Sequence, residues 1–488
     1  MNIQIQRGWM PDLAPFGVPE GGLVTAKNLL PFDDKYVKVQ DKQTYSSAAL
    51  ADTAQSAKEF KLVSGTRHAF IGTASKLYRL ETNKSLTDKS VAGGYTTGTN
   101  RWNFEQYGDT VLATNYTDAV QKFANFGGAG AFVALGGSPP KAKYMLLYKG
   151  YLILAYVNDG TAYPKKIQWS GLEAIESWTA SLLTGADSQS FPDGKGDITG
   201  IAKVADFFAV FHENSINVGY FSGAPYTFSF QHNRVENIGC FVPGSLVSIG
   251  HACLFWGEDD IYSFNGQVAE SIGYGVKEEV INNLNIGALN KVTAMHDPGN
   301  GLVLWAYPTG SNSSANRVLV YNYRTRKYTQ LELDMECIFS LHTGATDMDS
   351  IDSLYADISD MPYSMDSRLY QANSTVIACV DTDLYIDTLE GTDLMGTIET
   401  GEVKDGDKVV MVDNVRPRID NARADVNVRV GSRFDENDSP TYTSSTTVGS
   451  NGYANLRSTG RYHRVEVQTT DHDGIHDIEV NAVSAGMR

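Results

Sequence analysis

Two histidines near the C-terminus, His472 and His476, have a spacing that could hold a metal ion. Imidazoles four positions apart share one face of a helix, which is how one class of zinc site is built. Here the two residues flank Asp473-Gly474, a pair that favours a turn, so the spacing does not align the rings. We expect a solvated hairpin at this place and no metal site.

Clustered aspartates raise the question of calcium. An EF-hand loop needs oxygen ligands at positions 1, 3 and 5, a glycine at position 6 and a glutamate at position 12. Asp471, Asp473 and Asp477 supply only the first two of these. A second Asp-rich segment, residues 345–368, fails in a similar way and is expected to be an excursion from the rim of the fold.

Carboxylate pairs could support glycoside hydrolysis, which needs two carboxyl groups about 5 to 9.5 Å apart. Glu258-Asp-Asp260 lies in an expected turn and Glu278-Glu279 on an expected helix, so neither forms a recognisable catalytic pair. Gly194-Lys195 lacks the glycine and the hydroxyl of a phosphate-binding loop, and no G-x-S-x-G elbow occurs. The sequence therefore predicts no catalytic, cofactor-binding or metal-binding residue.

The elements that must position any site are seven apolar hairpins. Their second strands end in aromatic residues separated by 45, 46, 51, 44, 57 and 64 positions: Tyr78, Phe123, Trp169, Tyr220, Phe264, Tyr321 and Tyr385. A repeat of about 40 to 50 residues without helical periodicity is typical of a β-propeller. The two wide steps leave six or seven blades open, because they could contain an insertion or a strand supplied by the N-terminal segment.

Three regions differ in pattern. Residues 1–50 form an extended leader, expected to pack on a platform domain or on a neighbouring subunit. Residues 51–394 hold the propeller, with the best helical pattern at residues 276–285. Residues 395–488 contain short alternating strands between turns, which predicts an appended β-sandwich platform.

Composition limits the class of protein. Apolar residues make up 42% and charged residues 20% of the 488 positions, as in a folded globular protein. The four cysteines lie far apart without metal-finger spacing, and three of them sit in apolar runs. A net charge of −17 argues against a protein that grips nucleic acid or anionic membrane. The sequence has no signal-peptide pattern, so we expect synthesis in the cytoplasm.

The order of several motifs resembles the tail hub, or nozzle, proteins of short-tailed bacteriophages (the tail tubular protein B-like family). The matching stretches are Lys166-Ile-Gln-Trp-Ser170 with Trp178, Asp197-Ile-Thr-Gly-Ile201, Phe208-Ala-Val-Phe211, Ile216 to Phe221, Ile238-Gly-Cys240, Phe255 to Gly266, Arg416-Pro417, residues 456–464 and residues 483–488. The resemblance covers most of residues 160–488.

This resemblance implies a structural virion protein located in the tail. Six copies would form a ring docked to the head-to-tail adaptor ring, with tail fibres or tailspikes attached and genomic DNA passing through without specific binding. The hexamer would carry a formal charge of −102, six times −17, and acidic residues in its lumen would keep DNA mobile. The alternative is a propeller-fold tail component that binds or degrades glycans.

One basic cluster stands out in this acidic chain: Arg457, Arg461, His463 and Arg464. It is our candidate for an interface with the adaptor or a neighbouring subunit. An ordinary solvated strand edge explains the same residues equally well.

Overall fold

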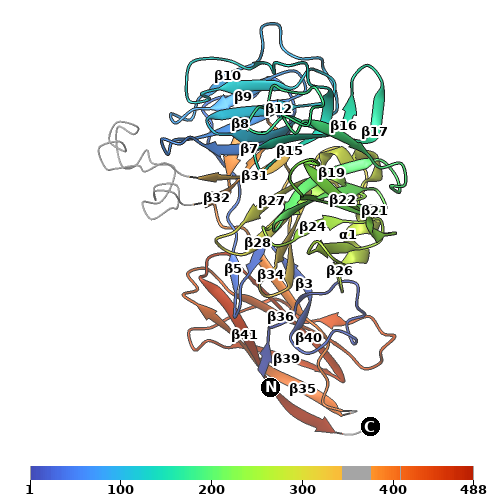
Figure 1. Ribbon diagram of the computed structural model, residues 1–488. Helices are drawn as coiled ribbons and strands as arrows, with labels where there is room; N and C mark the ends of the chain where they lie inside the picture. Colours follow the sequence, from blue (N-terminus) through green and yellow to red (C-terminus); the bar gives the residue numbers. More distant parts are fainter. Residues whose placement is uncertain (1, 343–374, 407, 487–488) are drawn as a thin grey trace.

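The computed structural model describes residues 2–342, 375–406 and 408–486, and these fold almost entirely into β-strands (Figure 1). The Asp-rich segment 345–368 lies outside the described residues. Seven antiparallel meanders of four strands, arranged like propeller blades, form the upper body in Figure 1. A second body at the bottom of the view is built from both ends of the chain.

Each of the first five meanders is a separate four-stranded sheet. Their strands are β7 (Ala54–Lys61), β8 (Arg67–Thr73), β9 (Leu77–Leu80) and β10 (Leu86–Asp88); β11 (Asn103–Tyr107), β12 (Thr110–Thr114), β13 (Gln121–Ala124) and β14 (Val133–Ala134); β15 (Lys141–Tyr148), β16 (Tyr151–Asn158), β17 (Ala162–Trp169) and β18 (Asp187–Ser190); β19 (Ile198–Val204), β20 (Phe207–His212), β21 (Ser215–Phe221) and β22 (Phe228–Glu236); β23 (Val247–Ser248), β24 (Cys253–Trp256), β25 (Ile261–Phe264) and β26 (Ala269–Ser271).

The sixth and seventh meanders differ because other parts of the chain join them. Their strands are β27 (Thr293–Asp297), β28 (Leu302–Tyr307), β29 (Arg317–Asn322) and β30 (Lys327–Leu331); β31 (Cys337–His342), β32 (Thr375–Val380), β33 (Ile386–Thr388) and the leader strand β6 (Gln43–Thr44). The helical pattern at residues 276–285 is confirmed as α1 (Lys277–Asn283), which lies with the short helices η1 (Pro243–Ser245) and η2 (Ile286–Lys291) beside these sheets.

The seven predicted hairpins are confirmed as antiparallel pairs, each formed by the second and third strands of a meander. The second strands are apolar on both faces because neighbouring meanders cover both: five of the six residues of β20 and all six of β28 are buried. The first strands lie toward the centre. Each contacts the first strand of the next meander, and β31 contacts β7.

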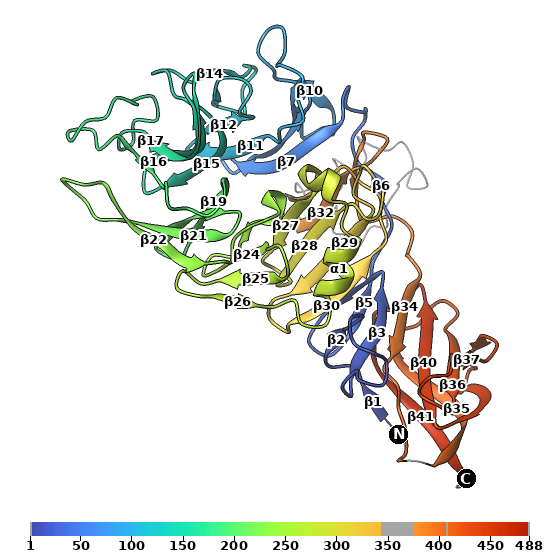
Figure 2. The ribbon, with the colours of Figure 1, turned by 90° about the vertical axis from the view of Figure 1, so that its right-hand side faces the viewer.

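The lower body contains two groups of strands (Figure 2). One sheet has the order β39-β35-β41-β5-β4, with β1 on β41; the other places β34, β40, β36 and β37 in line, with β38 on β36. These strands are β1 (Asn2–Gln4), β4 (Leu29–Pro31), β5 (Tyr36–Lys38), β34 (Gly396–Thr400), β35 (Val409–Asp420), β36 (Asn427–Arg433), β37 (Thr441–Tyr442), β38 (Thr446–Thr447), β39 (Ala454–Gly460), β40 (Tyr462–Thr469) and β41 (Gly474–Gly486). We refer to this body as the platform.

The leader joins the two bodies. Its strand β3 (Gly22–Lys27) pairs antiparallel with β34 of the platform and parallel with β30 of the sixth meander, and β2 (Gly8–Trp9) pairs with β3. Asp12 accepts hydrogen bonds from the backbone N–H groups of Glu278 and Glu279 at 2.9 and 2.8 Å, so the leader also caps α1.

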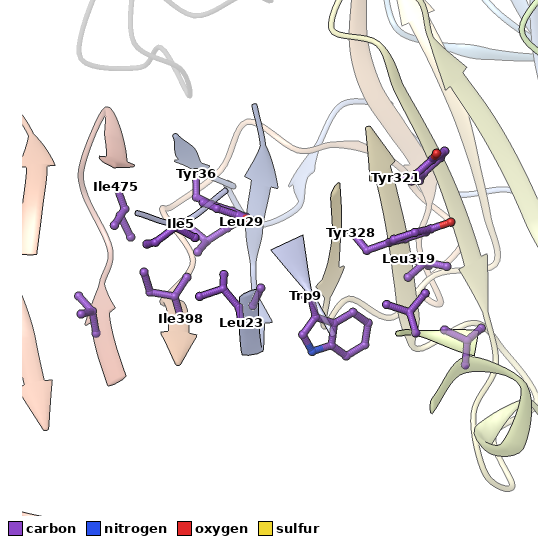
Figure 3. Packing of buried hydrophobic residues seen from close by; sticks show 14 of the residues in the cluster. Ile5, Trp9, Leu23, Leu29, Tyr36, Leu319, Tyr321, Tyr328, Ile398 and Ile475 are labelled. Carbon is purple, nitrogen blue, oxygen red and sulfur yellow. The ribbon is translucent and has the colours of Figure 1, made fainter. Parts of the chain in front are cut away.

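One hydrophobic core runs through this junction (Figure 3). Trp9, Leu23 and Tyr36 of the leader are buried between Tyr328 on one side and Ile398 on the other. The platform is therefore packed on the propeller-like body, not tethered to it.

Candidate functional site

The four residues of the predicted basic cluster lie on strands β39 and β40 and in the turn between them. Arg457 on β39 is exposed, and its Nε lies 3.5 Å from an oxygen of Asp413. Arg461 lies in the turn that follows, where its backbone N–H donates to the carbonyl of Arg433 at 3.0 Å. Of the four residues, Arg457 is the one whose charged group is mostly in solvent, with 79% of its side chain exposed.

Arg464 is held inside the platform by an ion pair that the sequence did not reveal. Its guanidinium lies 3.0 Å from Glu402, and Arg433 approaches the other oxygen of that carboxylate at 2.7 Å. The Glu402 side chain is 1% exposed. A buried carboxylate needs such partners, and removing one of them would leave an uncompensated charge. The charge of Arg464 is therefore paired within the platform, and its role in an interface stays a prediction.

His463 is also buried, which corrects its assignment to a surface cluster. Its Nε2 lies 3.2 Å from the carbonyl oxygens of Val410 and Gly460, contacts that require a proton on Nε2. Burial lowers the pKa of His463, so the ring is neutral. The residue lines an apolar cavity of about 320 Å³ between the platform sheets, beside Ile3 and Val480.

The histidine pair near the C-terminus takes two different environments. His476 lies 2.7 Å from Asp420, whereas His472 is fully buried. The expected solvated hairpin is therefore wrong for His472, because the surrounding platform and leader segments cover it. Within the described ranges, no group of three or more His, Cys, Asp or Glu side chains is placed to hold a metal ion.

A cavity of about 710 Å³ lies inside the propeller-like body. Antiparallel pairing brings the start of each first strand beside the end of its second strand. Three such pairs are Asn103 with Thr114, Lys141 with Asn158, and Ile198 with His212. These strand ends therefore meet at one end of the body, and Asn103, Asn115, Ile198 and Glu213, at or beside them, line this cavity.

The side chains on the wall from β15 to β20 carry charge and aromatic rings. The Lys143 ammonium lies 3.7 Å from the ring centre of Tyr156 and 5.5 Å from that of Tyr116. These two rings meet edge to face at 5.3 Å. The Tyr156 hydroxyl donates to Asp197 at 3.5 Å. Burial lowers the pKa of Lys143, and the nearby carboxylates of Asp197 and Glu213 oppose that shift.

Arg101 crosses to the opposite wall of the cavity. Its Nη1 donates to the carbonyl oxygen of Val292, which precedes β27, and burial lowers its pKa. Gly244 makes room for this contact, because a Cβ there would lie 2.1 Å from Arg101 Nη1. Tyr144 also lines the cavity, and burial raises the pKa of its hydroxyl.

The sequence did not predict this cavity as a site. Lys143 and Glu213 stand in ordinary strand and turn positions, and only Asp197 opens a motif that we had singled out. The missing information is the ring of meanders, which brings Lys143 and Glu213, 70 positions apart in the sequence, to one wall. Chemically, the arrangement offers cations, carboxylates and aromatic faces to one small ligand.

No protein-family model and no curated protein sequence matches the chain. Among solved structures, the computationally designed Ika8 protein is similar with a TM-score of 0.40 at 7% identity, covering 75% of this chain and 96% of that one. The extracellular domain of the putative hybrid two-component system BT4673 from B. thetaiotaomicron gives 0.42 at 12% identity, covering 78% and 44%. PorZ, a surface component of the type-IX secretion system of Porphyromonas gingivalis, gives 0.39 at 10%, covering 82% and 46%.

These TM-scores are too low to support a functional assignment. No helix in the described part of the chain has the length and apolar character needed to cross a membrane.

Proposed function

We propose that the chain is one of six identical subunits of the tail nozzle, or hub, of a short-tailed bacteriophage. In this role it docks to the head-to-tail adaptor ring, anchors fibres or tailspikes, and lines the channel through which the genome leaves. The role is structural and assigns no catalytic residue. Its support is the order of motifs from residue 160 onward together with the architecture of the platform.

The carrying observation is that both ends of the chain build the platform. The C-terminal strand β41 pairs along its length with β35, and the leader strands β1 and β5 also pair with β41. A platform joined to a propeller-like body through one core is a rigid subunit with two unlike faces. Closed rings arise from contacts between two different patches, and such a subunit can provide them.

The proposed function also includes a more specific fold. We infer a seven-bladed propeller whose last blade is completed by the leader strand β6, with a β-sandwich platform appended. The circle of contacts among the first strands supports the first part. The core shared by Val412, Val428, Val465 and Ile478 of the two strand groups supports the second.

Assembly on an adaptor tests the proposal. We expect the purified chain to be a monomer or weak oligomer that becomes a six-membered ring on the adaptor, as seen by mass photometry and negative-stain imaging. Reversal of the exposed platform charge in Arg457→Glu should weaken ring formation by about tenfold, the effect of roughly 1.4 kcal/mol. The matched control is Arg234→Glu, which reverses an exposed charge on β22.

A stable dimer of the isolated chain would contradict the nozzle role, and so would an adaptor ring that stays bare at saturating concentrations of the chain. Equal loss of ring formation in the Arg457 and Arg234 variants would instead contradict the assignment of Arg457 to the interface.

A further inference from the structure

The cavity of about 710 Å³ in the propeller-like body holds two cations without an anionic partner among the described residues. The groups that act electrostatically on Arg101 are Cys337 and Tyr144, and neither is a carboxylate. Its five N–H donors include one bonded to the carbonyl of Val292. Lys143 has tyrosine rings as its close contacts, and no carboxylate lies within ion-pair distance of it. Both groups can therefore receive an anion.

The same wall carries two carboxylates, and this limits which anion fits. Asp197 and Glu213 line the cavity with Lys143. A phosphate or sulfate group, which brings high charge density and no hydroxyl-rich frame, would be repelled by these carboxylates. A polyol offers hydroxyl groups that donate to carboxylate oxygens. A ligand with a single negative charge and several hydroxyl groups therefore satisfies both sets of side chains.

The aromatic rings add a third requirement. Tyr144 and Tyr156 line the cavity, and the ring of Tyr116 meets that of Tyr156 edge to face. Aromatic faces pack against apolar C–H surfaces, which a sugar ring presents on one side while its hydroxyl groups point outward. A volume of about 710 Å³ lies within the usual range for small-molecule sites and exceeds what one sugar ring needs.

We propose that this cavity binds an acidic saccharide, a short oligosaccharide that contains a uronic acid. Lys143 holds the sugar carboxylate from one wall, Arg101 donates its remaining N–H groups to ligand oxygens from the opposite wall, Asp197 and Glu213 accept hydrogen bonds from hydroxyl groups, and the tyrosines that line the cavity pack against the ring. The site goes beyond the structural role proposed above and does not depend on ring assembly. It gives the chain a contact with acidic surface polysaccharide that involves no bond cleavage.

Isothermal titration calorimetry on the full, isolated chain tests this proposal. The probe is a digalacturonate or trigalacturonate, and its methyl ester is the matched ligand that keeps the sugar frame and removes the charge. We expect the acid to bind at least tenfold more tightly than the ester, because a hydrogen bond to a charged group is worth about that factor or more. Inorganic sulfate should not displace the acid at equal concentration.

Two variants localise the binding. Lys143→Met removes the charge, keeps an unbranched apolar side chain, and should weaken binding of the acid by about tenfold or more. Lys149→Met changes an exposed lysine in the turn at the other end of β15 and β16, and should leave binding unchanged.

The proposal is overturned if the acid and its ester bind equally, if neither binds at millimolar concentration, or if sulfate competes as well as the saccharide. It is also overturned if both lysine variants lose binding to the same degree. Should Lys143→Met fail to fold, the comparison of acid with ester on the unmodified protein still decides the outcome. Because these measurements use the isolated chain, they leave the nozzle role to its own assembly test.

Discussion

At the scale of single residues, burial changed what the basic positions do. Arg464 and His463 lie next to each other in the sequence, but one is paired with Glu402 and the other lines a cavity. Glu402 is 62 positions from Arg464, so no local pattern announces the pair. The sequence could show that basic residues gather here; it could not show that the fold buries His463 and pairs Arg464 with Glu402.

His472 provides the clearest prediction at this scale, because its ring is fully buried and neither ring nitrogen has a hydrogen-bond partner in the described part of the chain. Burial, assisted by Lys38, lowers its pKa from 6.5 to about 4. The unfolded chain therefore binds more protons than the folded one between pH 6.5 and 4. As pH falls through this window, the free energy of unfolding should fall by up to about 3 kcal/mol from this group.

Urea unfolding of the protein and of His472→Leu at several pH values measures this contribution. The free energy of unfolding of the unmodified protein minus that of His472→Leu should decrease as pH falls, because only the unmodified protein has a side chain at position 472 that can be protonated. Asp387 acts in the opposite direction, since burial raises its pKa to about 6 and its contribution is lost as pH rises, but it is common to both proteins. Parallel pH profiles for the two proteins would refute the assignment to His472.

At the scale of elements, the hairpins were predictable and the strand that completes the last sheet was not. A hairpin such as β12–β13 brings together residues a few positions apart, so its apolar pattern is visible in one window. Strand β6 has two residues, and its partner β33 lies more than 340 positions later. The sequence left open whether the leader supplies a strand, and only the three-dimensional pairing shows which residues do so.

Ser46 tests how much this closure contributes. Its buried hydroxyl accepts from the backbone N–H of Ile386 at 3.0 Å and donates to the carbonyl of Ala48 at 2.9 Å. Ser46→Ala removes that acceptor from a buried N–H group, which should cost about 1 to 3 kcal/mol of stability. Hydrogen exchange should speed up in the peptide that contains β33, because the edge strand holds it less firmly.

The control for this experiment is Ser222→Ala, which removes an exposed hydroxyl bonded to the carbonyl of Tyr226 in another meander. Its free energy of unfolding should stay within about 0.5 kcal/mol of that of the unmodified protein. Unchanged exchange at β33 in Ser46→Ala, or faster exchange spread evenly over all meanders, would show that β6 does not hold the last sheet together.

At the scale of the whole molecule, the leader joins the two bodies through one shared core, so we expect them to unfold as one cooperative unit. The core passes from Trp305 in the sixth meander through Trp9 and Leu23 to Val467 in the platform. A boundary between residues 394 and 395 was a reasonable prediction from the change in strand pattern. The sequence alone could not show that strand β3 carries one sheet across that boundary, because β3 belongs to the leader and not to either side.

Trp9 is the place to test this cooperativity. Its ring is 5% exposed, and its indole N–H donates to the carbonyl of Val24 at 3.1 Å. We expect the unmodified protein to unfold in one calorimetric transition. Trp9→Ala should lower stability by about 3 to 5 kcal/mol and separate the platform from the propeller-like body as an earlier transition, because the cavity lies in their shared core. Phe16→Ala, also in the leader but 56% exposed, should keep the single transition. Two resolved transitions in the unmodified protein would mean that the platform is an independent domain, and the rigid subunit on which a nozzle ring depends would then lack its physical basis.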